Sequence, residues 1–290
     1  MLERSTILIT GSAGQLGRDL ADVFSRCGAY RVVAADRARL DVTDAQAARR
    51  FIEEVAPHVI LHAAAFTDVD ACETQPEKAF QVNAQGTQHV AAAAEGVGAT
   101  FVYISTDYVF DGAKASAYGE EDPACPLNVY GASKLQGEAL ARAQCARCFI
   151  VRTAWLYGLH GGNFVKTMLR LAKEQTPLQV VDDQRGTPTW SRDLARQIEA
   201  LVNTGFYGTY HASAQGACSW YEFARAIFEE CGQAVELAPV DSARFPRPAR
   251  RPGNSALDNE NLRARGLDLM PPWRESLNRF LALLREQVAS

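Results

Sequence analysis

Apolar positions in the first half of the chain form short uninterrupted runs, each followed by a longer stretch with helical spacing. The runs predict strands at residues 6–10, 31–35, 58–62, 100–105 and 148–153, and the intervening stretches predict helices at about 15–26, 44–55, 77–95 and 128–144. The runs do not alternate with polar residues, which is typical of strands covered by helices on both faces. The sequence therefore predicts an α/β fold with a Rossmann-type doubly wound parallel sheet.

The second half of the chain is less regular. Its pattern predicts a helix at 164–174, a strand at 178–181, a helix at 191–203 and a strand at 208–212, and the last two could extend the same sheet. Ser219 and Glu222 have the S-x-x-E spacing of a capping box, which predicts a helix that begins there and continues to about residue 231. An amphipathic helix that contains Trp273 and Phe280 ends the chain.

The change in pattern near residue 153 suggests two parts. We assign 1–153, plus about 187–213, to a dinucleotide-binding Rossmann domain. Residues 154–186 and 214–290 are assigned to a smaller, interleaved C-terminal part that binds the substrate, a sugar nucleotide in the interpretation developed below.

Composition and charge narrow the choice of partners. The chain has 290 residues, of which 47% are hydrophobic and 22% charged, and its 30 basic and 34 acidic residues give a net charge of −4. Without a long basic run, broad electrostatic binding of nucleic acid or of an anionic membrane is not expected. The apolar segment near the N-terminus is too short for a signal peptide or a membrane span, so we expect a cytoplasmic protein.

Cysteine spacing gives no sign of a disulfide framework. The seven cysteines are an odd number and are scattered along the chain, so they are expected to be reduced. Cys145 and Cys148 form a CxxC, but without a second pair or a histidine cluster nearby we interpret them as a helix end followed by a strand.

A glycine-rich segment, "GSAGQLG", lies between the first predicted strand and the first predicted helix. Its glycines let the backbone turn tightly and approach a pyrophosphate, while the following helix N-terminus supplies N–H donors. The spacing is GxxGxxG, one residue longer at the first gap than the commonest dinucleotide fingerprint. We expect a nicotinamide dinucleotide to contact Gly11, Gly14, Gln15, Leu16 and Gly17.

Charged residues after the second predicted strand bear on the choice of coenzyme. Asp36 could accept hydrogen bonds from the ribose hydroxyls and would repel a 2′-phosphate, which favours NADH. Arg37 or Arg39 could instead bind that phosphate, so NADPH and NADH both stay open. Asp41 and Val42, a little further along, are candidate adenine contacts.

The segment "YGASK" places Tyr130 and Lys134 on one face of a predicted helix. A lysine ammonium favours the phenolate, so we expect Lys134 to lower the pKa of Tyr130 and make it a usable proton donor. Ser105, Thr106 and Asp107 follow the fourth predicted strand, where ligand sites in open α/β sheets gather. A hydroxyl there can stabilise negative charge on a substrate oxygen.

Taken together, these motifs resemble the extended short-chain dehydrogenase/reductase superfamily. Within it, the order of "HAAAFTDVDACE", "VNAQGT", "STDYVFDG", "PLNVYGASKLQGE", "VRTAWLYG", "GGNFVKTMLRLA", "DDQRGTPT" and "RPARRPGNSALD" is similar to that of the dTDP-4-dehydrorhamnose reductases. The resemblance implies reduction of dTDP-4-dehydro-L-rhamnose to dTDP-L-rhamnose by NADPH or NADH.

The resemblance also implies roles for particular residues. Catalysis falls to Thr106, Tyr130 and Lys134. Further coenzyme contacts fall to Ala63, Ala64, Ala65, Thr67, Tyr130 and Lys134, and substrate contacts to Val69, Thr106, Asp107, Tyr130, Trp155 and Arg185. Some members of the family are dimers held by an acidic metal cluster. Here only Asp19 matches such a cluster, so Mg²⁺ is possible but not supported by the sequence, and a homodimer is possible.

Other functions on the same fold compete with this interpretation. Sugar-nucleotide dehydratases carry Asp-Glu after the threonine, whereas this chain has Asp107 and Tyr108, which argues against a dehydratase. A 4-epimerase is less firmly excluded, and a 4-ketoreductase for another dTDP-deoxysugar is the main enzymatic alternative. A non-catalytic regulatory subunit of the methionine adenosyltransferase type is the alternative from another class.

Overall fold

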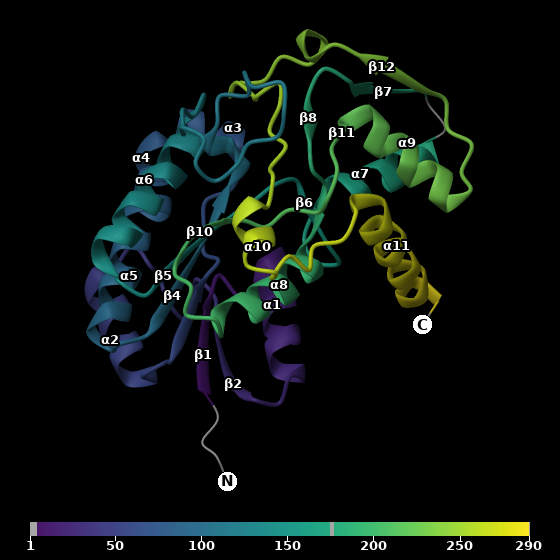
Figure 1. Ribbon diagram of the computed structural model, residues 1–290. Coiled ribbons are helices and arrows are strands. Elements are labelled where there is room, and N and C mark those ends of the chain that lie inside the picture. Colours follow the sequence, from purple (N-terminus) through teal and green to yellow (C-terminus); the bar gives the residue numbers. More distant parts are fainter. Residues whose placement is uncertain (1–4, 175–176, 290) are drawn as a thin grey trace.

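The computed structural model describes residues 5–174 and 177–289, and its centre is a six-stranded parallel sheet (Figure 1). The strand order is β10-β5-β4-β3-β1-β2. The strands are β1 Ser5–Thr10, β2 Tyr30–Ala35, β3 Val59–His62, β4 Thr100–Thr106, β5 Cys148–Thr153 and β10 Gly208–His211. The predicted strands of this sheet are confirmed, and the strand expected near 208–212 does extend it, beside β5.

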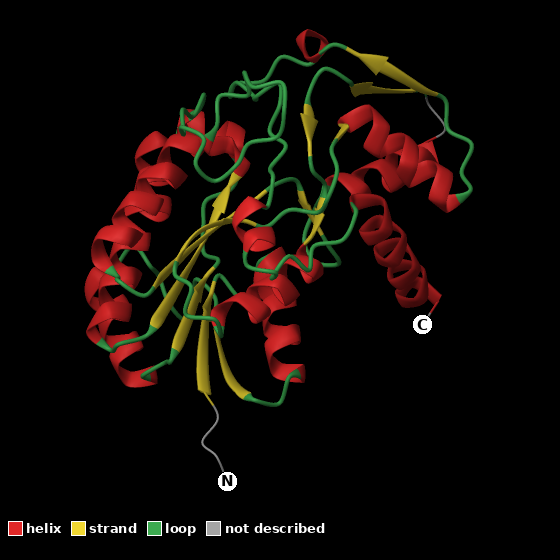
Figure 2. Cartoon of the chain, viewed as in Figure 1, coloured by secondary structure: helices red, strands yellow, loops and turns green. Residues whose placement is uncertain are grey.

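Helices cover both faces of the sheet (Figure 2). One layer contains α2 Ala45–Val55, α5 Gly86–Gly96 and α6 Val129–Gln144, and the other contains α1 Gln15–Arg26 and α8 Ser191–Val202. Because successive strand side chains point to opposite faces, Leu8 packs in the first layer's core while Ile7 and Ile9 pack in the second's. Burial on both faces explains the uninterrupted apolar runs, and the doubly wound sheet is confirmed.

The helix expected at 77–95 is interrupted in the structure. Residues 76–96 form α4 Pro76–Phe80, a π-helical turn η1 Gln81–Gln85 and then α5. The turn carries Asn83, whose buried side chain accepts a hydrogen bond from Phe66 N at 2.8 Å and donates to Phe66 O at 3.0 Å. Such π-turns commonly occur at functional sites. Apolar spacing cannot reveal this turn, because its cause is an amide that bonds to a distant loop.

The remaining elements form a second core beside the sheet. Short strands pair as β6 Leu156–Tyr157 with β9 Thr189–Trp190, β8 Arg185–Gly186 with β11 Cys218–Ser219, and β7 Leu178–Val181 with β12 Leu237–Val240. Three helices, α7 Phe164–Leu171, α9 Trp220–Cys231 and α11 Trp273–Ala289, surround an aromatic-rich interior. The predicted capping box at Ser219 is confirmed, and α9 ends where expected. The sequence pattern missed β12.

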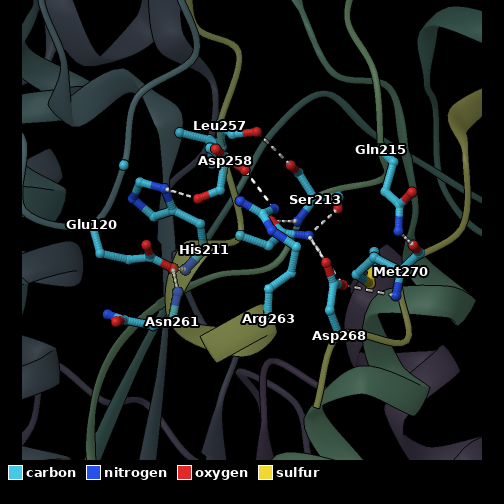
Figure 3. A network of polar contacts seen from close by, with 12 residues as sticks. Glu120, His211, Ser213, Gln215, Leu257, Asp258, Asn261, Arg263, Asp268 and Met270 are labelled. Atoms are coloured by element: carbon cyan, nitrogen blue, oxygen red, sulfur yellow. Dashed lines mark hydrogen bonds and ion pairs between the residues drawn. The ribbon is translucent and has the colours of Figure 1, made fainter. Parts of the chain in front are cut away.

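A buried polar network fastens the C-terminal segment to the edge strand β10 (Figure 3). The Glu120 carboxylate accepts hydrogen bonds from His211 N at 2.9 Å and from Asn261 N at 3.2 Å. The His211 ring in turn contacts the carbonyl oxygens of Tyr118 and Asp258. The short helix α10 Glu260–Ala264, which the sequence pattern did not predict, is thereby held against the sheet. Its residue Leu262 belongs to the core beneath α1 and α8.

Cysteine placement agrees with the expectation of reduced thiols. All seven cysteines are free. Cys145 follows α6 and Cys148 begins β5, and burial raises the pKa of these thiols to about 11 and about 12. Within residues 5–174 and 177–289, no helix combines the length and the apolar character that crossing a membrane requires.

Candidate active site

A cleft of about 820 Å³ lies beyond the carboxyl ends of the central strands. Nearly all sequence-predicted site residues line it: Gly11, Gly14, Gln15, Leu16, Gly17, Asp36, Arg37, Asp41, Val42, Ala63, Ala64, Ala65, Thr67, Val69, Thr106, Asp107, Tyr130, Lys134 and Trp155. This is the edge where parallel α/β sheets bind ligands, because loops from neighbouring strands converge there. The structure therefore brings every predicted site residue except Arg185 into one continuous hollow.

The glycine loop is packed so tightly that side chains would not fit. Gly11 has φ of +65°, and a Cβ on it would lie 2.6 Å from Ala64 N. A Cβ on Gly17 would lie 2.3 Å from Gly11 O. Gly14 is the N-cap of α1 and provides no side-chain cap, so the first N–H groups of this helix remain available to a ligand. An uncapped helix start beside a side-chain-free loop fits a dinucleotide pyrophosphate.

The charged residues that follow β2, beside this loop, differ in whether they reach the cleft. Asp36 accepts a hydrogen bond from Arg39 N at 3.0 Å, which closes the turn after β2. The Arg39 guanidinium donates to Ala34 O at 2.9 Å and lies over the Phe51 ring, and it does not line the cleft. Arg37 does line the cleft. Of the two arginines considered for a 2′-phosphate, only Arg37 is therefore placed beside Asp36 at the cleft wall.

Backbone packing at the start of α6 places Tyr130 beside Thr106. The Asn128 side chain caps the helix by accepting a hydrogen bond from Gly131 N at 2.8 Å. A Cβ on Gly131 would lie only 2.1 Å from Tyr108 O, so the first helical turn rests directly on the chain after Thr106. Both Tyr130 and Thr106 line the cleft, and Thr106 is close enough to lower the pKa of Tyr130. The glycine inside "YGASK" is thus what permits this close approach.

The protonation of Tyr130 and Lys134 differs from the sequence prediction. Burial raises the pKa of Tyr130 above its ordinary value, and the nearby Asp107 raises it further. Burial lowers the pKa of the Lys134 ammonium to about 7. The predicted lowering of the tyrosine pKa by the lysine is therefore wrong, because both groups are buried and desolvation outweighs their interaction. At neutral pH Tyr130 keeps its proton, as a proton donor must.

Asp107 is the buried carboxyl group of this site. One oxygen, Oδ1, accepts a hydrogen bond from the Thr106 hydroxyl at 2.9 Å, whereas Oδ2 is buried without a protein partner. Burial raises the pKa of Asp107 to about 6. Buried polar atoms in proteins are nearly always paired, so an orphaned carboxylate oxygen in a cleft indicates a place for a ligand donor.

Two stacked tryptophans border the opposite part of the cleft. The Trp155 and Trp220 rings lie 3.4 Å apart between centroids, with 2° between their planes. Trp155 has φ of +46°, which is uncommon for a residue other than glycine, and such strain often occurs at functional sites. Gly186 makes room for it, since a Cβ there would lie 2.2 Å from the indole.

Sequence reasoning missed Trp220. The capping box predicted where α9 begins, but the direction in which its first residue projects depends on tertiary packing. Arg185 also departs from expectation: it does not line the cleft, its side chain is half-exposed and its guanidinium lies 3.7 Å from the Glu222 carboxylate. The role of Arg185 in substrate binding stays a prediction.

Asp19, considered for a metal cluster, is buried and accepts a hydrogen bond from the Ser191 hydroxyl. In the described part of the chain, no three His, Cys, Asp or Glu side chains lie together in a way that could hold a metal ion.

Comparisons with known proteins agree on one family. Residues 5–286 match the family described as RmlD substrate binding domain. The dTDP-4-dehydrorhamnose reductase of Aggregatibacter actinomycetemcomitans is 41% identical, covering 95% of this chain and 98% of that protein. The crystal structure of dTDP-4-dehydrorhamnose reductase from Bacillus anthracis in complex with NADP has a TM-score of 0.94 and 43% identity, covering 97% of this chain and 99% of that one. The crystal structure of a dTDP-4-dehydrorhamnose reductase from Clostridium acetobutylicum has a TM-score of 0.95 and 44% identity, with the same coverage of both chains.

Proposed function

The chain belongs to the RmlD substrate binding domain family, and from that premise we propose that it reduces dTDP-4-dehydro-L-rhamnose to dTDP-L-rhamnose with NADPH or NADH. The observation that carries the proposal is the continuity of the cleft. One end is the glycine loop that fits a pyrophosphate, and the wall between that loop and the stacked tryptophans carries Thr106, Tyr130 and Lys134. A dinucleotide and a sugar nucleotide bound from the two ends would meet at these three side chains.

The coenzyme would be held by the glycine loop, by Asp36, Arg37, Asp41 and Val42 at the adenine end, and by Ala63, Ala64, Ala65, Thr67, Tyr130 and Lys134. The bound NADPH or NADH supplies a hydride to the keto carbon. The substrate would contact Val69, Thr106, Asp107, Tyr130 and Trp155, with Arg185 assigned to the nucleotide. These assignments rest on their position along the cleft and, for Arg185, on the sequence resemblance alone.

Tyr130 is the proton donor in this proposal. As negative charge develops on the substrate oxygen, the phenol donates its proton to it, and the product is the alcohol. Burial keeps the Tyr130 pKa high, so the phenol is protonated at neutral pH and transfers its proton only when a basic alkoxide forms beside it. The Thr106 hydroxyl, which donates to Asp107 Oδ1 in this structure, would turn to the substrate oxygen and hold it.

Lys134 acts on the other side of Tyr130. Its ammonium donates a hydrogen bond to Ile104 O at 2.7 Å and lies 4.1 Å from the centroid of the Tyr103 ring. An ammonium has three donors, so two remain for the ribose hydroxyls of the coenzyme. Its positive charge also stabilises the phenolate that remains after proton transfer.

The alternatives on this fold are less well supported. Tyr108 occupies the position where a dehydratase carries glutamate, and its ring packs edge-on against Tyr130, with centroids 5.6 Å apart. Burial raises the pKa of the Tyr108 phenol, so it stays protonated at neutral pH and cannot replace the carboxylate base that elimination of water needs. A non-catalytic regulatory subunit would not need an intact Thr106, Tyr130 and Lys134, and a 4-ketoreductase for a different dTDP-deoxysugar is separated only by the experiment below.

Three further features belong to the same proposal. Residues 1–153 with about 187–213 would bind the coenzyme, and residues 154–186 with 214–290 would bind the substrate. We also propose that the protein is located in the cytoplasm and forms a homodimer. Cell fractionation and light scattering of the purified protein test the last two directly.

The decisive test is turnover with several dTDP-4-keto sugars, followed at 340 nm with NADPH or NADH and by NMR of the product. We expect one reduced coenzyme oxidised per sugar, with the equilibrium shifted towards product at lower pH because the reaction consumes a proton. An epimerase would show no net oxidation, and a regulatory subunit would bind coenzyme without turnover. Activity only with another keto sugar would overturn the rhamnose assignment and keep the ketoreductase class.

A further inference from the structure

A fully buried carboxylate lies one helical turn beyond Lys134 on α6. Glu138 has no solvent exposure, and its two oxygens accept hydrogen bonds from Arg152 Nε at 2.9 Å and Nη2 at 2.8 Å. The Ser105 hydroxyl donates to the same carboxylate at 2.6 Å. Burying a carboxylate and a guanidinium is costly unless both are well paired, and replacing such a pair by apolar residues is often neutral or stabilising. The cost suggests a task beyond stability.

The strand register shows where Glu138, Arg152 and Ser105 lie in the sheet. In the sheet Ser105 of β4 stands opposite Arg152 of β5, and Arg152 stands opposite His211 of β10. Arg152 also lies 3.4 Å from the His211 ring, which contacts the Asp258 carbonyl in Figure 3. Glu138 therefore binds side chains from two adjacent strands, and one of them, Ser105, is the residue directly before Thr106.

Lys134 and Glu138 hold two consecutive residues of β4. Lys134 donates to Ile104 O, and Glu138 accepts from the next residue, Ser105. Thr106 follows immediately, so two successive turns of α6 fix the strand end that carries the catalytic hydroxyl. Tyr103 packs against the same turn, since its hydroxyl donates to Asn83 O at 3.0 Å and lies 3.3 Å from Lys134 O.

We propose that Glu138 is a positioning residue for the reductase reaction: held by Arg152, its carboxylate ties Ser105, the residue before Thr106, to α6 and places a negative charge one helical turn from the Lys134 ammonium. The inference rests on the role that the proposed function gives to Lys134. Glu138 does not line the cleft, so it acts through Lys134 and Ser105 and not on the substrate.

The other charged and titratable groups around Lys134 do not replace Glu138. Those on other segments are His62 of β3, Tyr103 of β4, Asp107 after β4 and Arg152 of β5. Those on α6 itself are Tyr130 and Arg142, whose guanidinium lies 3.6 Å from the Glu138 carboxylate. His62 is neutral at physiological pH because burial, followed by the Lys134 charge, lowers its pKa to about 3. Burial lowers the Lys134 pKa, and the Glu138 charge is the influence that opposes it.

The test compares Glu138→Gln with Asp193→Asn. Asp193 is a matched control: it is a buried carboxylate that accepts from a serine, Ser276 Oγ at 2.7 Å, and from an arginine, Arg279 Nη2 at 2.7 Å, and it lies away from the cleft. NADPH affinity is measured by fluorescence titration from pH 5.5 to about 9.5, a range that spans the Lys134 pKa of about 7.

For the wild type we expect NADPH affinity to fall as pH rises through the range where Lys134 loses its proton. In Glu138→Gln the midpoint of that fall should move to lower pH by about one unit, the scale expected for losing one nearby opposite charge. Asp193→Asn should lower the melting temperature and leave the midpoint unchanged. Glu138→Asp keeps the charge but cannot reach Ser105 as well, so its midpoint should stay while kcat falls.

In Glu138→Gln the new amide N–H₂ would face the Arg152 guanidinium, and both groups are hydrogen-bond donors. The double variant Glu138→Gln/Arg152→Met removes this donor–donor contact and is measured in parallel. It should shift the midpoint in the same direction but by less, because the Arg152 charge that opposes the Glu138 charge is lost as well. It decides the question if the single variant does not fold. An unchanged midpoint in the folded variants would overturn the proposal. Wild-type protein that binds NADPH but turns over no sugar would refute the proposed function. The pH midpoints of NADPH binding would still test the role of Glu138 in that case.

Discussion

The two ends of the cleft are built from different materials. The end proposed for the coenzyme is backbone: Gly11 and Gly17 leave no room for side chains, and the loop rests against the main chain at Ala64. The end proposed for the sugar is made of large side chains, with Trp155 and Trp220 stacked on one another from segments far apart in the sequence. A backbone surface tolerates no added atoms, whereas a surface of side chains is shaped by what those side chains are.

This contrast separates what each end can recognise. A pyrophosphate is the same in every dinucleotide, and a fixed set of backbone N–H groups suits it. A sugar nucleotide differs from its relatives by single hydroxyl groups, which side chains such as Asp107 can distinguish. Thr106, Tyr130 and Lys134 lie between the two ends and serve both ligands in the proposed function.

The largest effect is expected at that junction. Tyr130→Phe removes the proton donor, so kcat should fall roughly 10²- to 10⁴-fold, the usual range for general acid catalysis. Coenzyme and sugar KM values should change little, because neither end of the cleft is altered. The control is Tyr210→Phe, since the Tyr210 hydroxyl donates to Phe206 O away from the cleft. Near wild-type turnover in Tyr130→Phe would mean that the proton comes from elsewhere.

At the coenzyme end, Gly17→Ala should act through the backbone. Its Cβ would overlap Gly11 O and force the loop to move. Overpacking of this kind costs about 1–3 kcal/mol, which corresponds to a rise in coenzyme KM of roughly 5- to 150-fold. The matched control is Gly96→Ala, where a Cβ meets nothing within 4 Å. A larger change in the sugar KM than in the coenzyme KM would break the contrast between the two ends.

At the sugar end, Trp220→Leu should raise the KM for the dTDP-sugar by roughly two- to tenfold, because the stacking of one aromatic ring contributes about 0.5–1.5 kcal/mol. Coenzyme KM should not change. Trp273→Leu serves as control, since Trp273 is buried in the second core and does not line the cleft. It should lower the melting temperature and leave both KM values as they are. Equal sugar KM values in the two variants would remove Trp220 from the substrate site.

The smallest effect concerns coenzyme preference. NADH and NADPH should both support turnover, with kcat/KM values within about a hundredfold of each other. Asp36→Asn keeps a side-chain oxygen for the Arg39 N–H but removes the charge, and should shift preference towards NADPH by about two- to fivefold, the range for an exposed charge interaction. Asp36→Ala should shift it in the same direction. A shift towards NADH would show that Asp36 does not face the 2′-position.

Local sequence determined the parts of this protein that depend on neighbours along the chain. The uninterrupted apolar runs predicted the strands within a residue or so, because burial on both faces makes most positions of a central strand apolar. Glycine spacing predicted the phosphate loop, and the i, i+4 relation placed Tyr130 and Lys134 on one face. These inferences need only backbone geometry and the periods of helix and strand.

Tertiary structure decided what depends on distant contacts. It turned Trp220 towards the cleft, left Arg185 outside it, and set the interruption of the 77–95 helix by bonding Asn83 to Phe66. It also reversed the expected pKa of Tyr130, because desolvation is a property of everything packed around a group and not of its neighbour four residues away. The pairing of Glu138 with Arg152 could not be read from the sequence for the same reason. The register that sets Arg152 beside Ser105, and the packing of α6 against these strands, exist only in the folded protein.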